Sequence, residues 1–238
     1  MEVSKAEVVE RIRRHHTHFF CRRNIQPDSP LAQYKPAAVL VPLFFHQGEL
    51  HVLLTKRSMH VTSHPGEVSL PGGRMDASDK DEVETSLRET EEEIGLHRDL
   101  VEVIAQIPPM TSRDGYLVNP IVGFIPDDFT PKPNHDEVDS TFSLPLRRFL
   151  SGQDCYLAPF PYHGIMINIP MFLDTMPDTG KLYETYGLTA FICISVAVIL
   201  YERETEFELT PGAAISPKDP FAPFYHRLAN VNIPSAKM

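Results

Sequence analysis

The 238-residue sequence contains no tryptophan, only three cysteines and no excess of basic residues. Cys21, Cys155 and Cys193 are odd in number and show no Cys-x-x-Cys spacing, which predicts free thiols in a reducing compartment. Lys and Arg number 22 against 32 Asp and Glu, so the formal net charge is −10. This balance argues against extended nucleic-acid binding through a basic surface. An anionic substrate must therefore meet local positive charge or a metal ion.

Long apolar runs are also missing. The most apolar segment, residues 189–200, is too short to span a bilayer and favours a core helix, so no membrane partner is expected. The N-terminus lacks an apolar core followed by a small-residue cleavage site, which argues against secretion. Residues 11–23 are basic and histidine-rich and leave a mitochondrial import peptide as an alternative, although the acids Glu7 and Glu10 are unusual in one.

The most informative block is residues 71–96, which joins a glycine-led loop, an acid-rich helix and a terminal glycine. At about 100° per residue, a helix over residues 81–94 divides its side chains between two faces. Val83, Leu87 and Ile94 fall on one stripe, while Glu89, Glu92 and Glu93 centre on the opposite side. We therefore expect one face to pack in the core and the other to carry a carboxylate cluster.

The spacing of these three glutamates favours a metal ion. Carboxylates at i, i+3 and i+4 are neighbours, so their repulsion raises pKa values and lowers stability unless a cation lies among them. Because no Cys or His lies beside them at helical spacing, Mg²⁺ or Mn²⁺ is favoured over zinc. Gly95 is expected to end the helix, and Gly72-Gly73 to let the backbone approach the ion or its ligand. The alternative is an acidic run that is only a solvated helix face.

Arg88-Glu89 followed by Glu92-Glu93-Ile94-Gly95-Leu96 matches the Arg-Glu-x-x-Glu-Glu-x-Gly-apolar core of the Nudix box. The sequence therefore resembles a Nudix hydrolase, and the resemblance implies an α/β fold, an α/β/α sandwich with a mixed β-sheet. It also implies that Arg88 orients the glutamates and that Glu92 or Glu93 is the general base. The implied metal ligands are Glu89, Glu92, Glu93, the Gly73 carbonyl and, from outside the box, Glu137, whose alternative is a solvated loop acid.

One position departs from the box. Lys80 stands where the usual pattern has an early glutamate that is mainly structural. Asp79 or Asp81 is the candidate to replace that glutamate after a one-residue insertion.

Upstream, residues 53–58 read Leu-Leu-Thr-Lys-Arg-Ser and residues 64–73 read His-Pro-Gly-Glu-Val-Ser-Leu-Pro-Gly-Gly. These segments resemble the signature of the coenzyme A diphosphatase branch. The branch implies cleavage of coenzyme A and its acyl derivatives to 3′,5′-ADP and 4′-(acyl)phosphopantetheine. Thr62 replaces a usual Arg and leaves the choice between free and acylated substrate open. The candidate substrate-binding residues are Arg57, Ser58, His64, Gly66, Glu67 and Gly72.

Two alternatives to this function remain. One is a Nudix hydrolase for another nucleoside diphosphate derivative, such as ADP-ribose, NADH or a nucleotide-capped RNA. The other is a Nudix module that senses a nucleotide without cleaving it.

The chain divides into three expected parts: an N-terminal helical extension (1–30), a Nudix hydrolase domain (31–205) and a C-terminal tail (206–238). The tail ends Ala236-Lys237-Met238, a variant of the peroxisomal Ser-Lys-Leu signal. We therefore expect the peroxisomal import receptor as a partner and the peroxisome as the location, with the mitochondrion or cytosol as alternatives.

Apolar runs and turn residues predict the other elements. Residues 37–45 and 50–55 are expected to form a hairpin around Gln47-Gly48. Further strands are expected at 101–107, 117–125 and 165–173, where Pro170 favours an edge or a bulge. Helices are expected at 3–13, 146–150 and 188–201. The proline-rich segments 126–133, 159–161 and 211–223 are expected to be surface loops, the first leading into a loop with Glu137 that closes over the site.

Overall fold

The computed structural model describes residues 3–16, 25–26, 28–162, 165–210 and 212–221. Its helices are α1 (Lys5–Arg13), α2 (Glu82–Ile94) and α3 (Gly187–Tyr201), with short 3₁₀ helices η2 (Pro30–Gln33), η3 (Arg98–Leu100) and η4 (Leu146–Leu150). Its strands are β1 (Lys35–His46), β2 (Glu49–Arg57), β3 (Val68–Ser69), β4 (Gly72–Arg74), β5 (Glu102–Gln106), β6 (Met110–Thr111), β7 (Tyr116–Phe124), β8 (Val138–Pro145), β9 (Cys155–Tyr162), β10 (Ile165–Thr175), β11 (Leu182–Thr185), β12 (Glu208–Thr210) and β13 (Ala213–Ala214).

The main sheet is mixed. It has eight strands with the central order β3-β2-β1-β7-β5, while β4, β6 and β8 pair with β1, β7 and β2. β1 runs parallel to β7, whereas β2 and β4 are antiparallel to it. The β1–β2 hairpin turns at Gln47 and Gly48, both with positive φ, as a two-residue hairpin turn requires. The predicted hairpin is therefore confirmed.

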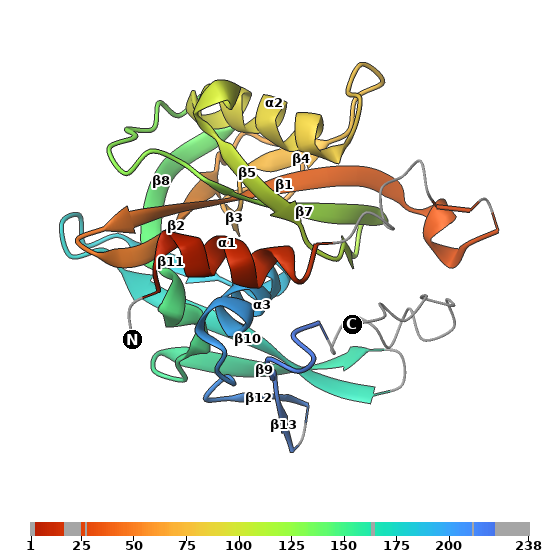
Figure 1. The fold of residues 1–238 in the computed structure, drawn as a ribbon, viewed down its shortest axis with the longest axis vertical. Coiled ribbons are helices and arrows are strands. Elements are labelled where there is room, and N and C mark those ends of the chain that lie inside the picture. The colour runs from red at the N-terminus through yellow and green to blue at the C-terminus, as the bar shows by residue number, and fades with distance from the viewer. Residues whose placement is uncertain (1–2, 17–24, 27, 163–164, 211, 222–238) are drawn as a thin grey trace.

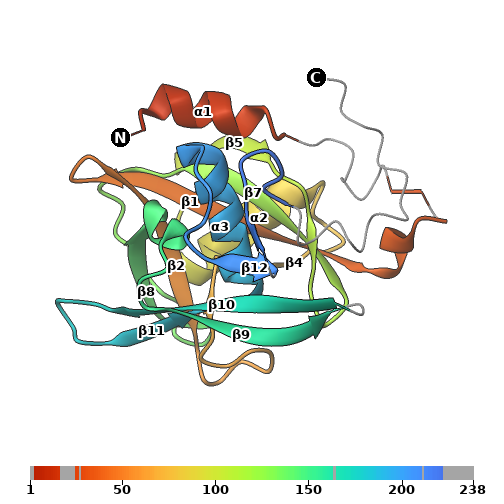
Figure 2. The same ribbon diagram turned by 90° about the horizontal axis from the view of Figure 1, so that it is seen from below.

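Helices cover both faces of this sheet (Figure 1). α2 lies on one face, and α1 and α3 lie on the other. Residues 190–200 of α3 are all buried, because α3 packs between the main sheet and a second, three-stranded sheet of order β11-β10-β9 (Figure 2). A helix that is apolar on every side requires such enclosure. The predicted α/β/α sandwich with a mixed sheet is confirmed.

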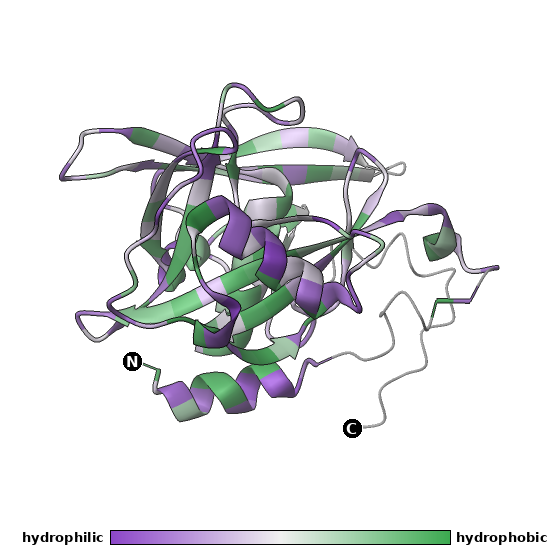
Figure 3. Ribbon diagram, turned by 90° about the horizontal axis from the view of Figure 1, so that it is seen from above, coloured by the Kyte–Doolittle hydropathy of each residue, from purple (hydrophilic) through white to green (hydrophobic). Residues whose placement is uncertain are grey.

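The two outer helices differ in hydropathy along their visible sides. Seen from above, α2 presents mostly hydrophilic residues, whereas hydrophilic and hydrophobic residues alternate along α1 (Figure 3). Val8 and Ile12 of α1 are fully buried and join the same core cluster as the strands and α3. Leu209 and Ile215, beyond the expected domain end at residue 205, belong to that cluster too. The three-part division of the chain stays a prediction.

One prediction about proline was wrong, and another holds only locally. Pro159 and Pro161 lie in β9 and not in a loop. β9 is an edge strand of its sheet, where a missing N–H is tolerated. β10, which contains Pro170, is the central strand of that sheet. β11 pairs only with residues 172–175 of β10, so the stretch around Pro170 pairs with β9 alone.

The cysteines, the C-terminal end and the membrane prediction are compared with the described residues next. Cys155 and Cys193 are free thiols, as predicted, while Cys21 and the Ala236-Lys237-Met238 end lie outside the described residues. Among the helices that are described, none is long and apolar enough to cross a membrane. In the third proline-rich segment, β13 occupies two of the residues expected to be loop.

Candidate active site

α2 begins and ends as the sequence predicts. The Asp81 side chain caps its first turn by accepting from the Glu84 N–H at 2.9 Å. Gly95 ends it in the left-handed region, with φ 70°. These two caps fix which residues α2 turns toward the sheet.

The predicted division of α2 into an apolar core face and an outer acidic face was wrong. Ile94 is buried, but Val83 and Leu87 are only half-buried. Glu93 is 3% exposed, and Thr85, Ser86 and Thr90 are buried beside it. The inward face is therefore largely polar, and Glu93 lies beneath the helix instead of on its outer side.

Two glycines in β4 make room for these carboxylates. The Gly72 N–H donates to Glu93 Oε2 at 3.2 Å, with Gly72 at φ 148°. A Cβ on Gly72 would lie 2.4 Å from the Ala38 carbonyl oxygen, and a Cβ on Gly73 would lie 2.4 Å from the Glu89 carboxyl carbon. Larger residues at either position would collide with backbone or with the acid cluster. The leading glycines thus let the backbone of β4 approach Glu89 and Glu93.

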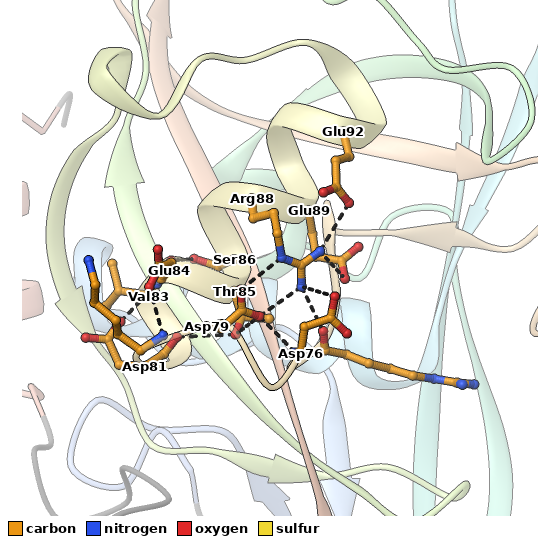
Figure 4. A network of polar contacts seen from close by, with 12 residues as sticks. Asp76, Asp79, Asp81, Val83, Glu84, Thr85, Ser86, Arg88, Glu89 and Glu92 are labelled. Carbon is orange, nitrogen blue, oxygen red and sulfur yellow. Dashed lines mark hydrogen bonds and ion pairs between the residues drawn. The ribbon is translucent and has the colours of Figure 1, made fainter.

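Arg88 donates hydrogen bonds to three acidic side chains of the site (Figure 4). Its Nε and Nη2 donate to the two oxygens of Asp79, both at 2.9 Å. Its Nη1 donates to Glu89 and Glu92, both at 3.1 Å. The predicted contacts of Arg88 with the glutamates are therefore present. Because Arg88 contacts both glutamates, it limits where their carboxylates can point.

Asp79, and not Asp81, takes the position opposite Arg88 that the departure at Lys80 left open. It is buried, and it also accepts from the Thr85 hydroxyl at 2.9 Å. The hydrogen bonds from Arg88 lower the pKa of Asp79 to about 2, against the opposing effect of burial. Asp79 is therefore ionised at neutral pH and anchors Arg88.

Glu93 has the opposite electrostatic character. Burial raises its pKa to about 8, only partly offset by the Gly72 N–H and by Arg57, whose Nη1 lies 3.8 Å from Glu93 Oε1. Burial also raises the pKa of Glu89. Glu137 acts on both carboxylates by charge repulsion, so all three acids lie close enough to interact. Among the described residues Glu93 therefore has no close positive partner, although Arg88 pairs with Glu89.

The loop before Glu137 is fastened to the end of α2. The Lys132 N–H donates to the Ile94 carbonyl at 2.8 Å and the Asn134 N–H donates to the Glu93 carbonyl at 2.9 Å. The Asn134 carbonyl in turn accepts from the Glu137 N–H at 2.9 Å. These bonds satisfy the last carbonyls of the helix. They explain why Glu137, 44 residues after Glu93 in the sequence, lies beside the box.

The candidate substrate-binding residues in β2 and the loop that follows it differ in their contacts. Ser58 is buried at 3% exposure, and its hydroxyl accepts from the His60 N–H, so it serves the loop's own structure. Arg57 is turned toward Glu93 and donates to the Ser63 carbonyl at 3.1 Å. Gly66 has φ 74°. The carbonyl of the next residue, Glu67, accepts a hydrogen bond from the Arg57 backbone N–H at 2.9 Å. The Arg57 side chain faces Glu93 of the acid cluster, and the Ser58 N–H donates to the Glu137 backbone carbonyl at 2.8 Å.

His64 bridges two loops. Its Nδ1 lies 3.1 Å from a Glu67 oxygen and its Nε2 lies 2.5 Å from Asp114 Oδ2, in the turn between β6 and β7. The hydrogen bond to Asp114 raises the pKa of His64. No pattern in the sequence singled out Asp114, so the partner of His64 was not predicted.

A pocket of about 300 Å³ adjoins this loop and is lined by Lys56, Gly66, Glu67, Tyr183 and Tyr186, among others. A larger cavity of about 820 Å³ lies between α1, the β1–β2 turn and the end of α3, and its lining includes none of the predicted site residues. The site is therefore identified by its acidic residues and their contacts, and not by the volume of a cavity.

The donor set fits a hard cation. It consists of carboxylates and backbone oxygen, and the burial of Glu93 without a tight positive partner leaves a charge deficit that a divalent ion would relieve. In the described part of the chain, no three His, Cys, Asp or Glu side chains are already gathered as a set of ligands. Glu92 is instead ion-paired with Arg88.

Comparison with known proteins agrees with this geometry. The NUDIX domain family matches residues 34–151. The peroxisomal coenzyme A diphosphatase NUDT7 of Mus musculus is 38% identical over 172 residues, covering 72% of this chain and 73% of that protein. The mitochondrial Nudix hydrolase 15 of Arabidopsis thaliana is 41% identical over 180 residues, covering 74% of this chain and 62% of that protein.

Among solved structures, the Nudix hydrolase RenU of M. smegmatis matches with a TM-score of 0.42 and 18% identity, covering 48% of this chain and 73% of that one. The box on α2, the glycines of β4 and the identity to the mouse and plant proteins lead to one assignment. This chain belongs to the Nudix family and is a Nudix hydrolase, an enzyme that acts on diphosphate bonds.

Proposed function

We propose that this enzyme hydrolyses the diphosphate bond of coenzyme A and its acyl derivatives, with Mg²⁺ or Mn²⁺, to 3′,5′-ADP and 4′-(acyl)phosphopantetheine. The observation that carries the chemistry is the placement of Glu93 and Glu89 against the backbone of Gly72 and Gly73. Oxygen ligands surround a space that lacks positive charge, next to a backbone that a diphosphate can approach closely.

In this proposal Glu89, Glu92, Glu93 and the Gly73 carbonyl hold the ion, with Glu137 as a further ligand. When bound, the ion neutralises the diphosphate and lowers the pKa of a coordinated water. Glu92 or Glu93 accepts the proton of the attacking water. Both acids suit that role, because Glu92 is exposed and Glu93 has a pKa near neutrality.

Arg88 acts as a positioning residue. Its two bonds to Asp79 hold the guanidinium while the remaining nitrogen contacts Glu89 and Glu92. A fixed guanidinium limits the orientations of both carboxylates, which favours a preorganised site. Arg57 supplies positive charge on the other side of Glu93 and is the candidate phosphate contact. Of the other candidates, Gly66 and Glu67 line the pocket of about 300 Å³. His64 joins the loop to the β6–β7 turn, Gly72 donates to Glu93, and buried Ser58 supports the loop.

The substrate is supported by the relative from mouse, which is named a coenzyme A diphosphatase, and by the motif around Arg57 and Gly66. The pocket beside Glu67 offers additional space at the loop that carries this motif. The rival functions are hydrolysis of ADP-ribose, NADH or capped RNA, and nucleotide sensing without cleavage.

The test is a panel of coenzyme A, acyl-coenzyme A, ADP-ribose and NADH, each incubated with the full chain and Mg²⁺ or Mn²⁺. We expect coenzyme A or its acyl form to be cleaved at least tenfold faster in kcat/KM, equal to about 1.4 kcal/mol. Faster cleavage of ADP-ribose or NADH contradicts the substrate. Binding of all four without any product contradicts catalysis.

Location and partner form a separate part of the proposal. We expect import into peroxisomes through Ala236, Lys237 and Met238, supported by the peroxisomal name of the mouse relative. The plant relative is named mitochondrial, so the mitochondrion is the matched alternative. A fluorescent protein fused at the N-terminus should enter peroxisomes, and deletion of the last three residues should make it diffuse. Diffuse fluorescence with the C-terminus free contradicts this location.

A further inference from the structure

Most of the positive charge near the acid cluster is already engaged. Arg88 contacts Asp79, Glu89 and Glu92, and Arg57 faces Glu93. The loop between Arg57 and Glu67 contains no lysine or arginine. A substrate with several phosphate charges therefore needs a cation from another element.

Arg113, in the turn between β6 and β7, supplies such a cation with its guanidinium. It is exposed, and among the described residues no carboxylate oxygen lies within 4 Å of its guanidinium. The guanidinium carbon lies 5.5 Å from the centre of the Phe160 ring, in β9. Stacking on an aromatic face holds a guanidinium while leaving its N–H groups free to donate. Arg113 is therefore both positioned and unused.

A chain of contacts joins Arg113 to the acid cluster. Arg57 lies beside Glu93 and also donates to the Ser63 carbonyl. The next residue, His64, contacts Asp114, which directly follows Arg113. The loop after β2 thus spans the distance from the glutamates to the β6–β7 turn. Arg113 lies at the opposite end of this series of contacts from Glu93.

We propose that Arg113 binds a phosphate group of the substrate that is not cleaved, which in coenzyme A is the 3′-phosphate. The proposal rests on the function proposed above. A monophosphate carries two negative charges and three oxygens, and the planar guanidinium fork pairs with two of those oxygens at once. The scissile diphosphate belongs beside Gly73, so a cation one loop away fits a phosphate separated from it by a ribose.

His64 has a defined part in this arrangement. Asp114 is the acid nearest to Arg113 in the sequence, and its carboxylate is held by His64 Nε2 at 2.5 Å. Without His64, Asp114 is free to pair with Arg113 and to repel a phosphate. His64 is therefore a positioning residue that keeps Arg113 available.

The kinetic test compares coenzyme A with 3′-dephospho-coenzyme A, using the full chain and saturating Mg²⁺. Arg113→Ala should lower the preference for coenzyme A about tenfold, through KM and not kcat, equal to about 1.4 kcal/mol. The control is Arg147→Ala, which removes an exposed arginine paired with Glu49 far from the box. It should keep the preference of the unaltered enzyme.

Arg74 is the matched rival. It also stacks on an aromatic ring, 5.2 Å from the centre of Tyr116, but it directly follows Gly73. We expect Arg74→Ala to affect both substrates equally, because both contain the diphosphate. If Arg74→Ala abolishes the preference and Arg113→Ala does not, the assignment to Arg113 is overturned.

A binding test separates this inference from the proposed function. Calorimetry without metal should give tighter binding of 3′,5′-ADP than of 5′-AMP, and Arg113→Ala should remove the difference. His64→Ala should reduce it, and adding Asp114→Asn to His64→Ala should restore it. Equal binding of 3′,5′-ADP by the unaltered chain and Arg113→Ala overturns the inference. Failure to cleave coenzyme A, with this binding difference intact, overturns only the proposed function.

Discussion

Asp79 and Glu93 are both buried acids beside an arginine, yet their electrostatic states differ. Asp79 forms two hydrogen bonds of 2.9 Å with Arg88, which lower its pKa to about 2. Glu93 lies 3.8 Å from the nearest Arg57 nitrogen, and burial raises its pKa to about 8. The difference shows that burial raises the pKa of an acid unless close hydrogen bonds from a cation outweigh it. Asp79 stabilises the fold, whereas Glu93 is kept short of positive charge.

The largest effect is expected from Glu93→Gln. Turnover of the best substrate should fall about 10³-fold, or about 4 kcal/mol, because the amide cannot replace a charged ligand or base. Steady-state kinetics at saturating Mg²⁺ measures it, with circular dichroism as a check on folding. The matched control is Glu91→Gln on the same helix, where Glu91 pairs with Arg98. A Glu93→Gln enzyme within tenfold of full turnover contradicts the role of Glu93.

Asp79→Asn tests the other half of the comparison. It leaves Arg88 without its tight partner, so the free energy of unfolding should fall by about 3 kcal/mol. Urea unfolding measures the change. Asp76→Asn is the control, because Asp76 is 68% exposed and lies 3.9 Å from Arg88. Its effect should stay below about 0.5 kcal/mol. Equal effects of the two substitutions would remove Asp79 from its structural role.

The pH dependence of stability is the third effect, and it is the smallest when counted per unit of pH. Glu93 has a folded pKa near 8 against 4.5 for the ordinary group, so the folded state holds a proton that the unfolded state has lost between these values. Stability should therefore fall as pH rises from 4.5 to about 8, by up to about 1.4 kcal/mol per pH unit. The contribution of Asp79 has the opposite sign and is lost as pH falls from 3.8 to about 2.

The measurement is urea unfolding of the metal-free chain across this pH range, compared with Glu93→Gln. The difference between the two proteins isolates the contribution of Glu93. Parallel stability curves for the two proteins between pH 4.5 and 8 would show that Glu93 has an ordinary pKa.

Local patterns predicted the long elements well. The apolar runs around Gln47-Gly48 predicted the β1–β2 hairpin, and the box predicted α2 with its Gly95 end. The short strands β3 and β4 are too brief to show a period, and β8 was not predicted. The strand β9 was missed because its prolines signal a loop, although an edge strand tolerates them.

The site was predicted in composition but not in geometry. Periodicity placed Glu93 on the outer side of α2, because a helical wheel assumes that acids face water. The polar inward face is set by Gly72 and Gly73, which lie on a different element. Likewise, the choice of Asp79 over Asp81, and the contact between His64 and Asp114, depend on how loops fold in space. Such contacts are not encoded in the spacing of residues along one element.

The central claim is that Glu93 is kept for a cation, and Mn²⁺ titration calorimetry of the full chain at pH 7 tests it most directly. Running the titration in buffers of different ionisation enthalpy counts the protons released, since an ion must displace the proton that Glu93 holds below its pKa. We predict that the unaltered chain releases a proton on binding Mn²⁺ and that Glu93→Gln binds at least tenfold more weakly without releasing one. Equal affinity and equal proton release in the two proteins would contradict the account.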